Sequence, residues 1–195
     1  MMEHMATAKE LPLLPFASAS LWEQWLAEYH AQLDGVWIKV AKKASGIASV
    51  THDEALDVAL CYGWIDGQRK TYDSQFFLQK FTPRRPKSLW SKRNVAKVAK
   101  LTAAGKMQPA GLAEVEAAQR DGRWEAAYDS PKNMAVPEDF LKALEENKQA
   151  LAFYNTLSKS SIYTIAWRLQ TAKKPETRRR RFDALLAMLE SGELH

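Results

Sequence analysis

Residues 55–94 read ALDVALCYGWIDGQRKTYDSQFFLQKFTPRRPKSLWSKRN, and this stretch decides the fold of the first half of the chain. Its apolar residues recur at helical spacing up to Cys61. Thr51 and Glu54, just before it, form the T-x-x-E pattern of a helix capping box. Gly63 then stands where a helix-ending glycine is expected, because glycine adopts the left-handed conformation at low cost. The stretch therefore begins with a predicted short helix that ends just before Gly63.

A β-hairpin is predicted next, with aromatic residues on both arms. Residues 64–72 read as the first strand, and Gly67 within it indicates a bulge or a close backbone approach. Asp73-Ser74 is a turn signal, and residues 76–82 read as the returning strand.

The hairpin leads into a stiff basic loop and then into a helix. Pro83 and Pro86 hold the arginines between them in an extended segment. Ser91 is the expected N-cap of a helix over residues 92–104, which ends at Gly105. An anion is favoured at such a helix start, because unpaired backbone N–H groups point outward there.

These motifs carry a family resemblance. The ordered combination of GWIDG, FTPR and WSKxN is specific, whereas each motif alone is weak. Four segments together resemble the YdeI/OmpD-associated family, also called bacteriocin-protection proteins, and the resemblance runs from about Val36 to the C-terminus: EALDVALCYGWIDGQ, FFLQKFTPRRPKSLWSKRN, GKMQPAGLAEVEAAQRDGRW and KPETRRRRFDALLAML. The resemblance implies a soluble bacterial protein linked by name to an outer-membrane porin and to bacteriocin resistance. It carries over no catalytic residue.

Composition narrows the class of protein. A chain of 195 residues with 46% hydrophobic residues can bury a substantial core. The net charge of +5 and the pI of about 9.2 favour an anionic partner. One cysteine allows no internal disulfide, and no signal peptide or membrane-spanning run is apparent, so we expect a cytoplasmic protein without membrane insertion.

The remaining segments complete an α+β prediction. A helix capped by Ser18 or Ser20 precedes a strand at Val36–Val40, which can pair with the hairpin in a small antiparallel sheet. Residues 1–14 are expected to be mobile. We predict an α+β domain over residues 15–130 and an all-helical subdomain over residues 131–195.

In that helical subdomain, we expect the helix capped by Ser158 to be the buried one. Trp167 lies within it, among residues that leave little polar surface.

The sequence shows no recognisable catalytic or metal-binding motif. The four histidines are scattered without metal-ligand spacing, so no metal site is expected, and no cofactor motif is present. Cys61 is predicted to be a small buried residue rather than a nucleophile. For Asp66, we favour pairing with Arg69 or Arg84 over a role as a general base.

Cations and aromatic rings are interleaved along the hairpin and the loop. This pattern suits an anionic or stacking ligand, and the competing interpretation is a solvated loop with its aromatic residues in the core. Arg178–Arg181 is a second basic cluster, for which a solvated helix face is expected. The predicted ligand-binding residues are Trp64, Asp66, Arg69, Lys80, Phe81, Arg84, Arg85, Trp90, Ser91 and Asn94.

The leading functional hypothesis is a non-enzymatic binding or stress-protection protein of the YdeI/OmpD-associated type, with an anionic small molecule or a protein as its partner. The alternative is a nucleic-acid-binding module that uses the same residues. A weaker alternative is an enzyme centred on Asp66 with Lys80 or Arg84. The sequence leaves the oligomeric state open.

Overall fold

A four-stranded sheet forms the centre of the first half of the chain in the computed structural model, which describes residues 10–129 and 133–193. The second half is helical, so the predicted α+β class with a helical C-terminal region is confirmed. The chain divides into two compact units. Unit 1 takes in the described residues up to Ser88 together with Asn94–Glu125, and unit 2 takes in Leu89–Arg93 and the described residues from Ala126 onward.

Thirteen elements are assigned in the described residues. In chain order they are β1 (Leu13–Pro15), α1 (Ala19–Tyr29), β2 (Val36–Ala41), the 3-10 turn η1 (Lys43–Ser45), α2 (His52–Cys61), β3 (Trp64–Thr71), β4 (Phe76–Pro83), α3 (Lys92–Ala103), α4 (Pro109–Arg120), α5 (Glu138–Glu146), α6 (Lys148–Tyr154), α7 (Lys159–Gln170) and α8 (Pro175–Glu190).

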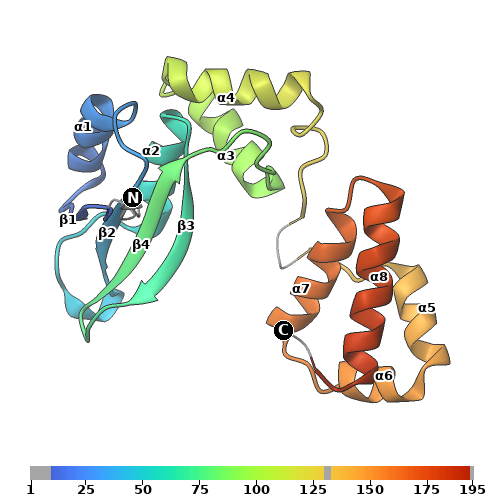
Figure 1. Cartoon of the computed structure of the whole chain (residues 1–195). Coiled ribbons are helices and arrows are strands. Elements are labelled where there is room, and N and C mark those ends of the chain that lie inside the picture. The colour runs from blue at the N-terminus through green and yellow to red at the C-terminus, as the bar shows by residue number, and fades with distance from the viewer. Residues whose placement is uncertain (1–9, 130–132, 194–195) are drawn as a thin grey trace, which may run out of the picture. The chain divides into compact units, whose positions relative to one another are not determined.

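The sheet has the order β1-β2-β4-β3, and Figure 1 shows α1 and α2 behind it. The predicted hairpin is confirmed as β3 and β4, and the predicted strand as β2. The first strand corrects the sequence analysis, because Leu13 and Leu14 were expected to be mobile but pair in parallel with β2. Pro15 is compatible with this strand since β1 lies at the edge of the sheet. Residues 1–9 lie outside the described residues.

Alternation along β2 builds the core of unit 1. Val36, Ile38 and Val40 are buried toward the helices. On that side, the ring of Trp22 from α1 lies 5.5 Å from the ring of Phe81, measured between centroids. The indole of Trp22 donates a 3.0 Å hydrogen bond to the carbonyl of Ala55, so a fully buried polar group of the core has a partner.

The ends of α2 follow the sequence signals closely. The capping box predicted from Thr51 and Glu54 is present, and the following Gly63 has φ +75°. The carbonyl of Cys61 then accepts a 3.1 Å hydrogen bond from the N–H of Gln108, just before α4. A Cβ on Gly111 would lie 2.8 Å from the carbonyl oxygen of Leu60, closer than real Cβ contacts. Glycine therefore lets α4 approach the end of α2.

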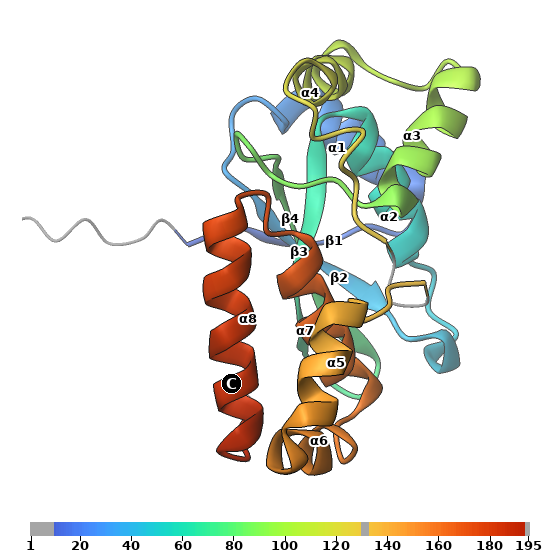
Figure 2. The ribbon, with the colours of Figure 1, turned by 90° about the vertical axis from the view of Figure 1, so that its right-hand side faces the viewer.

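Unit 2 is a set of four helices around one apolar cluster, with α8 beside α6 and α7 (Figure 2). Its fully buried side chains are Phe140, Leu144, Ala150, Ile165, Leu169, Leu185 and Leu189. A bidentate pair joins Arg178 on α8 to Asp139 on α5, with oxygen–nitrogen distances of 2.8 and 2.9 Å. The hydrogen bonds from Arg178 lower the pKa of the Asp139 carboxyl.

The structure corrects the expectation for Trp167. The helix α7 does contribute buried residues, but these are Ile165, Ala166 and Leu169, whereas Trp167 is only half-buried and meets the ring of Tyr128 edge-on. A helix of 3.6 residues per turn cannot turn every apolar residue inward, so the widest residue lies at the side of the buried stripe. The predicted boundary between residues 130 and 131 falls outside the described residues.

Replacing Gly111 by alanine should destabilise the protein by about 1–3 kcal/mol, because the new methyl group collides with rigid backbone. Helix propensity alone gives the opposite sign, since alanine is favoured over glycine by about 1 kcal/mol within a helix. Urea unfolding decides between the two signs. The matched control is Ala113→Gly at an exposed position of the same helix, which should cost about 1 kcal/mol.

Cys61 should react slowly with thiol reagents in the native protein. Burial raises the pKa of this thiol to about 11, so very little thiolate exists at neutral pH. We expect labelling at pH 8 to be about a hundredfold slower than for a peptide thiol of ordinary pKa, and urea should restore the normal rate. Rapid labelling without urea would contradict the buried placement.

In unit 2, Phe140→Ala should cost about 3–5 kcal/mol, as expected for a fully buried aromatic residue. Trp167→Ala should cost clearly less, because part of its ring already contacts solvent. Urea unfolding followed by circular dichroism tests this order, and a larger loss at Trp167 would show that the burial assignment is wrong.

Candidate functional site

One face of the sheet in unit 1 carries interleaved aromatic and basic side chains. Successive strand residues point to opposite faces, so the residues that alternate with the buried side of β2 point away from α1 and α2. We call this surface the aromatic–basic face. It consists of Trp37, Lys39, Lys70, Tyr72, Phe76 and Lys80.

The lysines of this face lie against its rings. The Nζ atom of Lys39 is 4.3 Å from the ring centroid of Tyr72, and that of Lys70 is 4.7 Å from the ring of Trp37. Lys80 lies directly across from Trp37 in the β2–β4 pairing, at 6.0 Å from the same ring. The aliphatic stems of these lysines cover aromatic surface while the ammonium groups stay near water.

The charge of this face is uniformly positive. Within the described residues, the strand positions that share the face include no aspartate or glutamate. Asp73, in the hairpin turn beside it, uses its Oδ1 atom to accept hydrogen bonds from the backbone N–H groups of Gln75 and Phe76. No carboxylate on the strands therefore neutralises the three lysines.

A β-bulge decides which hairpin residues reach this face. Asp66 pairs with Phe81 and Arg69 with Gln79, so β3 contains one residue more than β4 over the same interval. The bulge expected at Gly67 is confirmed. Because of the extra residue, Asp66 and Arg69 both point toward the helices, and Lys70 points to the aromatic–basic face.

The three large aromatic residues predicted to bind a ligand are core residues instead. Trp64 is 1% exposed, Phe81 is fully buried and Trp90 is 2% exposed. The ring of Trp64 packs edge-on against Trp22 and Trp25 of α1. Their ligand-binding assignment is therefore corrected, because they face the interior and offer no surface to a ligand.

The predicted anion site in the basic loop is corrected as well. Arg84 is 6% exposed and Asn94 is 8% exposed, so neither side chain is presented at the surface. Ser91 does not stand free before a helix, since its backbone forms a bridge with Tyr128. Arg85 alone of the two loop arginines is exposed.

Sequence reasoning missed the residue that holds this loop. The carbonyl of Arg85 accepts hydrogen bonds from the backbone and hydroxyl of Ser88, and Lys87 between them has φ +67°. Arg123 is 6% exposed. It donates a 2.9 Å hydrogen bond to the carbonyl of Ser88 and forms an ion pair with Asp121. No local pattern signals this contact, because Arg123 comes 35 residues after the loop.

Asp66 has a different partner from those expected. Its carboxylate lies 3.0 Å from Nε2 of His52, the first residue of α2, and the expected pairing with Arg69 or Arg84 is wrong. Lys80 belongs to the opposite face of the sheet from Asp66. Lys80, one of the two catalytic partners considered for Asp66, therefore does not lie beside it.

Basic residues in unit 2 are engaged within that unit. Arg178 pairs with Asp139, Arg179 pairs with Asp183 one turn along α8, and Arg181 donates to the carbonyl of Arg168. Arg178 and Arg181 therefore connect α8 to α5 and α7, whereas Arg179 pairs within α8.

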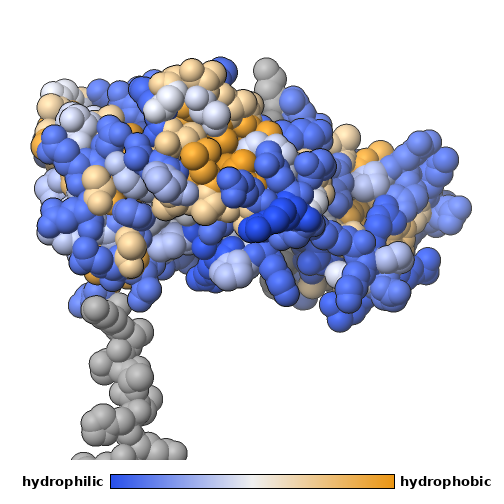
Figure 3. Space-filling view, turned by 90° about the horizontal axis from the view of Figure 1, so that it is seen from above, coloured by the Kyte–Doolittle hydropathy of each residue, from blue (hydrophilic) through white to orange (hydrophobic). Residues whose placement is uncertain are grey.

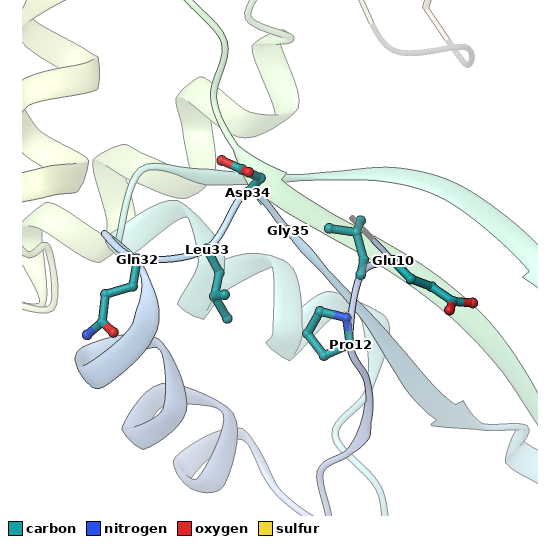
Figure 4. A pocket seen from close by; sticks show the side chains of 7 residues that line it. Glu10, Pro12, Gln32, Leu33, Asp34 and Gly35 are labelled. Carbon is teal, nitrogen blue, oxygen red and sulfur yellow. The ribbon is translucent and has the colours of Figure 1, made fainter. Parts of the chain in front are cut away.

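Two further surface features are a hollow beside the turn before β2 and a hydrophobic area. A hollow of about 150 Å³ lies beside the turn before β2, and Figure 4 shows the side chains of Glu10, Gln32 and Asp34 pointing away from one another there. Figure 3 shows a small hydrophobic area on an otherwise largely hydrophilic face. In residues 10–129 and 133–193, no three His, Cys, Asp or Glu side chains gather to hold a metal ion. No helix there is long and apolar enough to cross a bilayer.

Two family models match the chain. The model described as a domain of unknown function (DUF8412) matches residues 14–114, which is just over half of the chain and includes all of β2 to β4 and two of the three residues of β1. The model described as "Bacteriocin-protection, YdeI or OmpD-Associated" matches residues 133–192. GWIDG, FTPR and WSKxN lie inside the first match and the arginine-rich segment lies inside the second, whereas the segment at residues 105–124 extends beyond the first match.

No curated protein and no solved structure matches the chain. The chain belongs to the family of the DUF8412 domain, and its residues 133–192 form a domain of the bacteriocin-protection, YdeI or OmpD-associated family.

Proposed function

We propose that this protein is a non-enzymatic binding protein that takes an anionic, stacking ligand on the aromatic–basic face, and that this ligand is single-stranded nucleic acid. One observation carries the proposal. Three lysines and three aromatic rings are interleaved on adjacent strands, on the side of the unit 1 sheet that points away from α1 and α2, and no carboxylate shares these strand positions in the described residues.

Single strands suit this surface for two reasons. Their unstacked bases can lie on aromatic rings, whichever base is present, because every base has a π-face. Their phosphates attract clustered lysines through a sequence-independent electrostatic interaction. A duplex keeps its bases stacked and offers only the second of these two interactions.

Moving the lysines off the rings, so that a base can stack there, should cost little free energy. In the free protein, Lys39 and Lys70 lie over the rings of Tyr72 and Trp37. Such a contact at an exposed site is worth only about 0.5–1 kcal/mol. The flexible lysine side chains can therefore move to phosphates while a base takes their place on the ring.

The proposal also assigns different roles to the two parts of the chain. We assign binding to residues 15–130 and a helical subdomain to residues 131–195. The compact units and the two family matches support this division, although Leu89–Arg93 pack with the second unit.

We propose a cytoplasmic location, which suits the free, buried Cys61. Bacteriocin protection is the physiological role proposed from the family name.

Charge reversal tests the position of the site. Lys39→Glu with Lys70→Glu should weaken binding of a fluorescent oligothymidine at low salt by about tenfold or more, and should reduce the dependence of affinity on salt. The matched control is Lys100→Glu with Lys106→Glu, which changes the net charge equally at exposed positions of unit 1 outside the sheet. If both double variants lose affinity equally, the attraction is diffuse and the proposal of a localised site is wrong.

Removing a ring tests stacking separately from charge. Tyr72 is 45% exposed, so Tyr72→Ala should leave folding intact. Stacking on an aromatic side chain contributes about 1–3 kcal/mol per base, so affinity should fall about fivefold or more while the salt dependence stays unchanged. If a duplex of the same length binds as tightly as the single strand, the proposal that the ligand stacks on the rings is wrong. A protein partner or another polyanion then becomes the better hypothesis.

A further inference from the structure

A cavity lies on the other side of the same sheet, beside the start of α2. This cavity of about 290 Å³ opens between the loop that follows β2, the start of α2 and the β3–β4 hairpin. Its lining includes Lys42, Lys43, Ile47, His52, Arg69 and Phe77. In Figure 1 this loop and the tip of the hairpin lie at the same end of unit 1.

The loop that forms one wall is held at both of its ends. The N–H of Lys42 donates 2.8 Å to the carbonyl of Gln75, and its Nζ donates 2.7 Å to the carbonyl of Asp73. At the other end, the hydroxyl of Ser49 accepts from the N–H of Ala41. These bonds fix the wall against the hairpin before any ligand arrives.

Arg69 is positioned in the cavity by a buried amide. Gln79 is 2% exposed, and its Oε1 accepts a 3.1 Å hydrogen bond from Nε of Arg69. The guanidinium also lies 4.3 Å from the ring centroid of Phe77. Among the described residues, no hydrogen bond engages the two Nη groups of Arg69. An oriented guanidinium of this kind matches carboxylate or phosphate oxygens through two parallel N–H donors.

His52 adds a second oriented polar group to the lining. Asp66 fixes its ring through Nε2, at 3.0 Å, which leaves Nδ1 without a hydrogen-bond partner in the described part of the chain. Both side chains of this pair are about three-quarters buried. The carboxylate therefore holds the imidazole in place and does not line the cavity itself.

We propose that this cavity binds a small organic anion, a carboxylate or a phosphate ester with a short apolar body. The lining contains four residues that are or can become cationic and no aspartate or glutamate. Its remaining surface includes Val40, Ile47 and Val50, which suit an apolar body. The volume lies near the lower end of the range of ligand pockets, about 300–1,000 Å³, so the ligand is small.

This site is separate from the one proposed for nucleic acid. The bulge places Arg69 and Lys70 on opposite faces of the sheet, so the two ligands would contact different side chains. Failure of either proposal leaves the other standing.

Nuclear magnetic resonance titration of the full chain with benzoate tests the site. We expect saturable shifts of the backbone signals of Ile47, Val50 and His52 and of the Nε–H of Arg69, and no such shifts with the neutral benzamide. Phenyl phosphate, titrated in parallel, decides which of the two anion classes binds more tightly. The absence of saturable shifts with both anions would overturn the proposal.

A conservative variant separates geometry from charge. Arg69→Lys keeps the positive charge but loses the planar fork and the bond to Gln79, so benzoate affinity should fall about tenfold or more. The control Arg120→Lys, at an exposed position of α4, should bind benzoate as the unaltered protein does. Unchanged affinity in Arg69→Lys would refute the assignment.

Two further variants check positioning and independence. Gln79→Met should weaken benzoate binding and broaden the Nε–H signal of Arg69 if Gln79 positions the guanidinium. If that variant fails to fold, Arg69→Lys still decides. Tyr72→Ala should leave benzoate binding unchanged, and a loss of equal size would show that the two sites are not separate.

Discussion

The side chain of Gln79, buried in a central strand of the sheet, sets the constraint on which both proposed sites depend. A buried amide needs hydrogen bonds, since an unsatisfied polar group costs about 1–3 kcal/mol. Gln79 obtains them from Nε of Arg69 and from the carbonyls of Gly67 and Gln68. Those two carbonyls belong to the residues between Asp66 and Arg69, where the pairing with β4 shifts. The amide and the β-bulge therefore stabilise each other.

The bulge sorts the charges of β3 between two surfaces. In a regular strand, Asp66 and Arg69 would face opposite sides because they are three residues apart. With the extra residue they share the helix side, where Asp66 orients His52 and Arg69 lines the cavity. Lys70 points to the aromatic–basic face, where it lies against Trp37. One inserted residue thus gives a single hairpin the proposed anion pocket on one face and a basic, aromatic surface on the other.

Local patterns predicted much of the backbone. The capping box at Thr51 and the glycine at position 63 depend on neighbouring residues only, and the structure contains both. The hairpin and the strand at Val36 follow from period-two alternation, which a strand with one buried face requires. The strand at Leu13 was missed because three residues that include a proline carry too little pattern. Its pairing with β2 comes from tertiary structure and not from its own propensity.

The site was harder to predict because residue type does not show which face of an element a side chain occupies. Trp64 and Trp37 are both strand tryptophans beside charged residues, yet Trp64 enters the core and Trp37 lies under lysine. The difference depends on which side α1 packs, and α1 meets the sheet through Trp22, far from either residue in sequence. The pairing of His52 with Asp66 likewise joins two elements, since His52 begins α2 and Asp66 lies in β3. A side chain whose partner comes from another element can be assigned a role only once the packing of helices on the sheet is known.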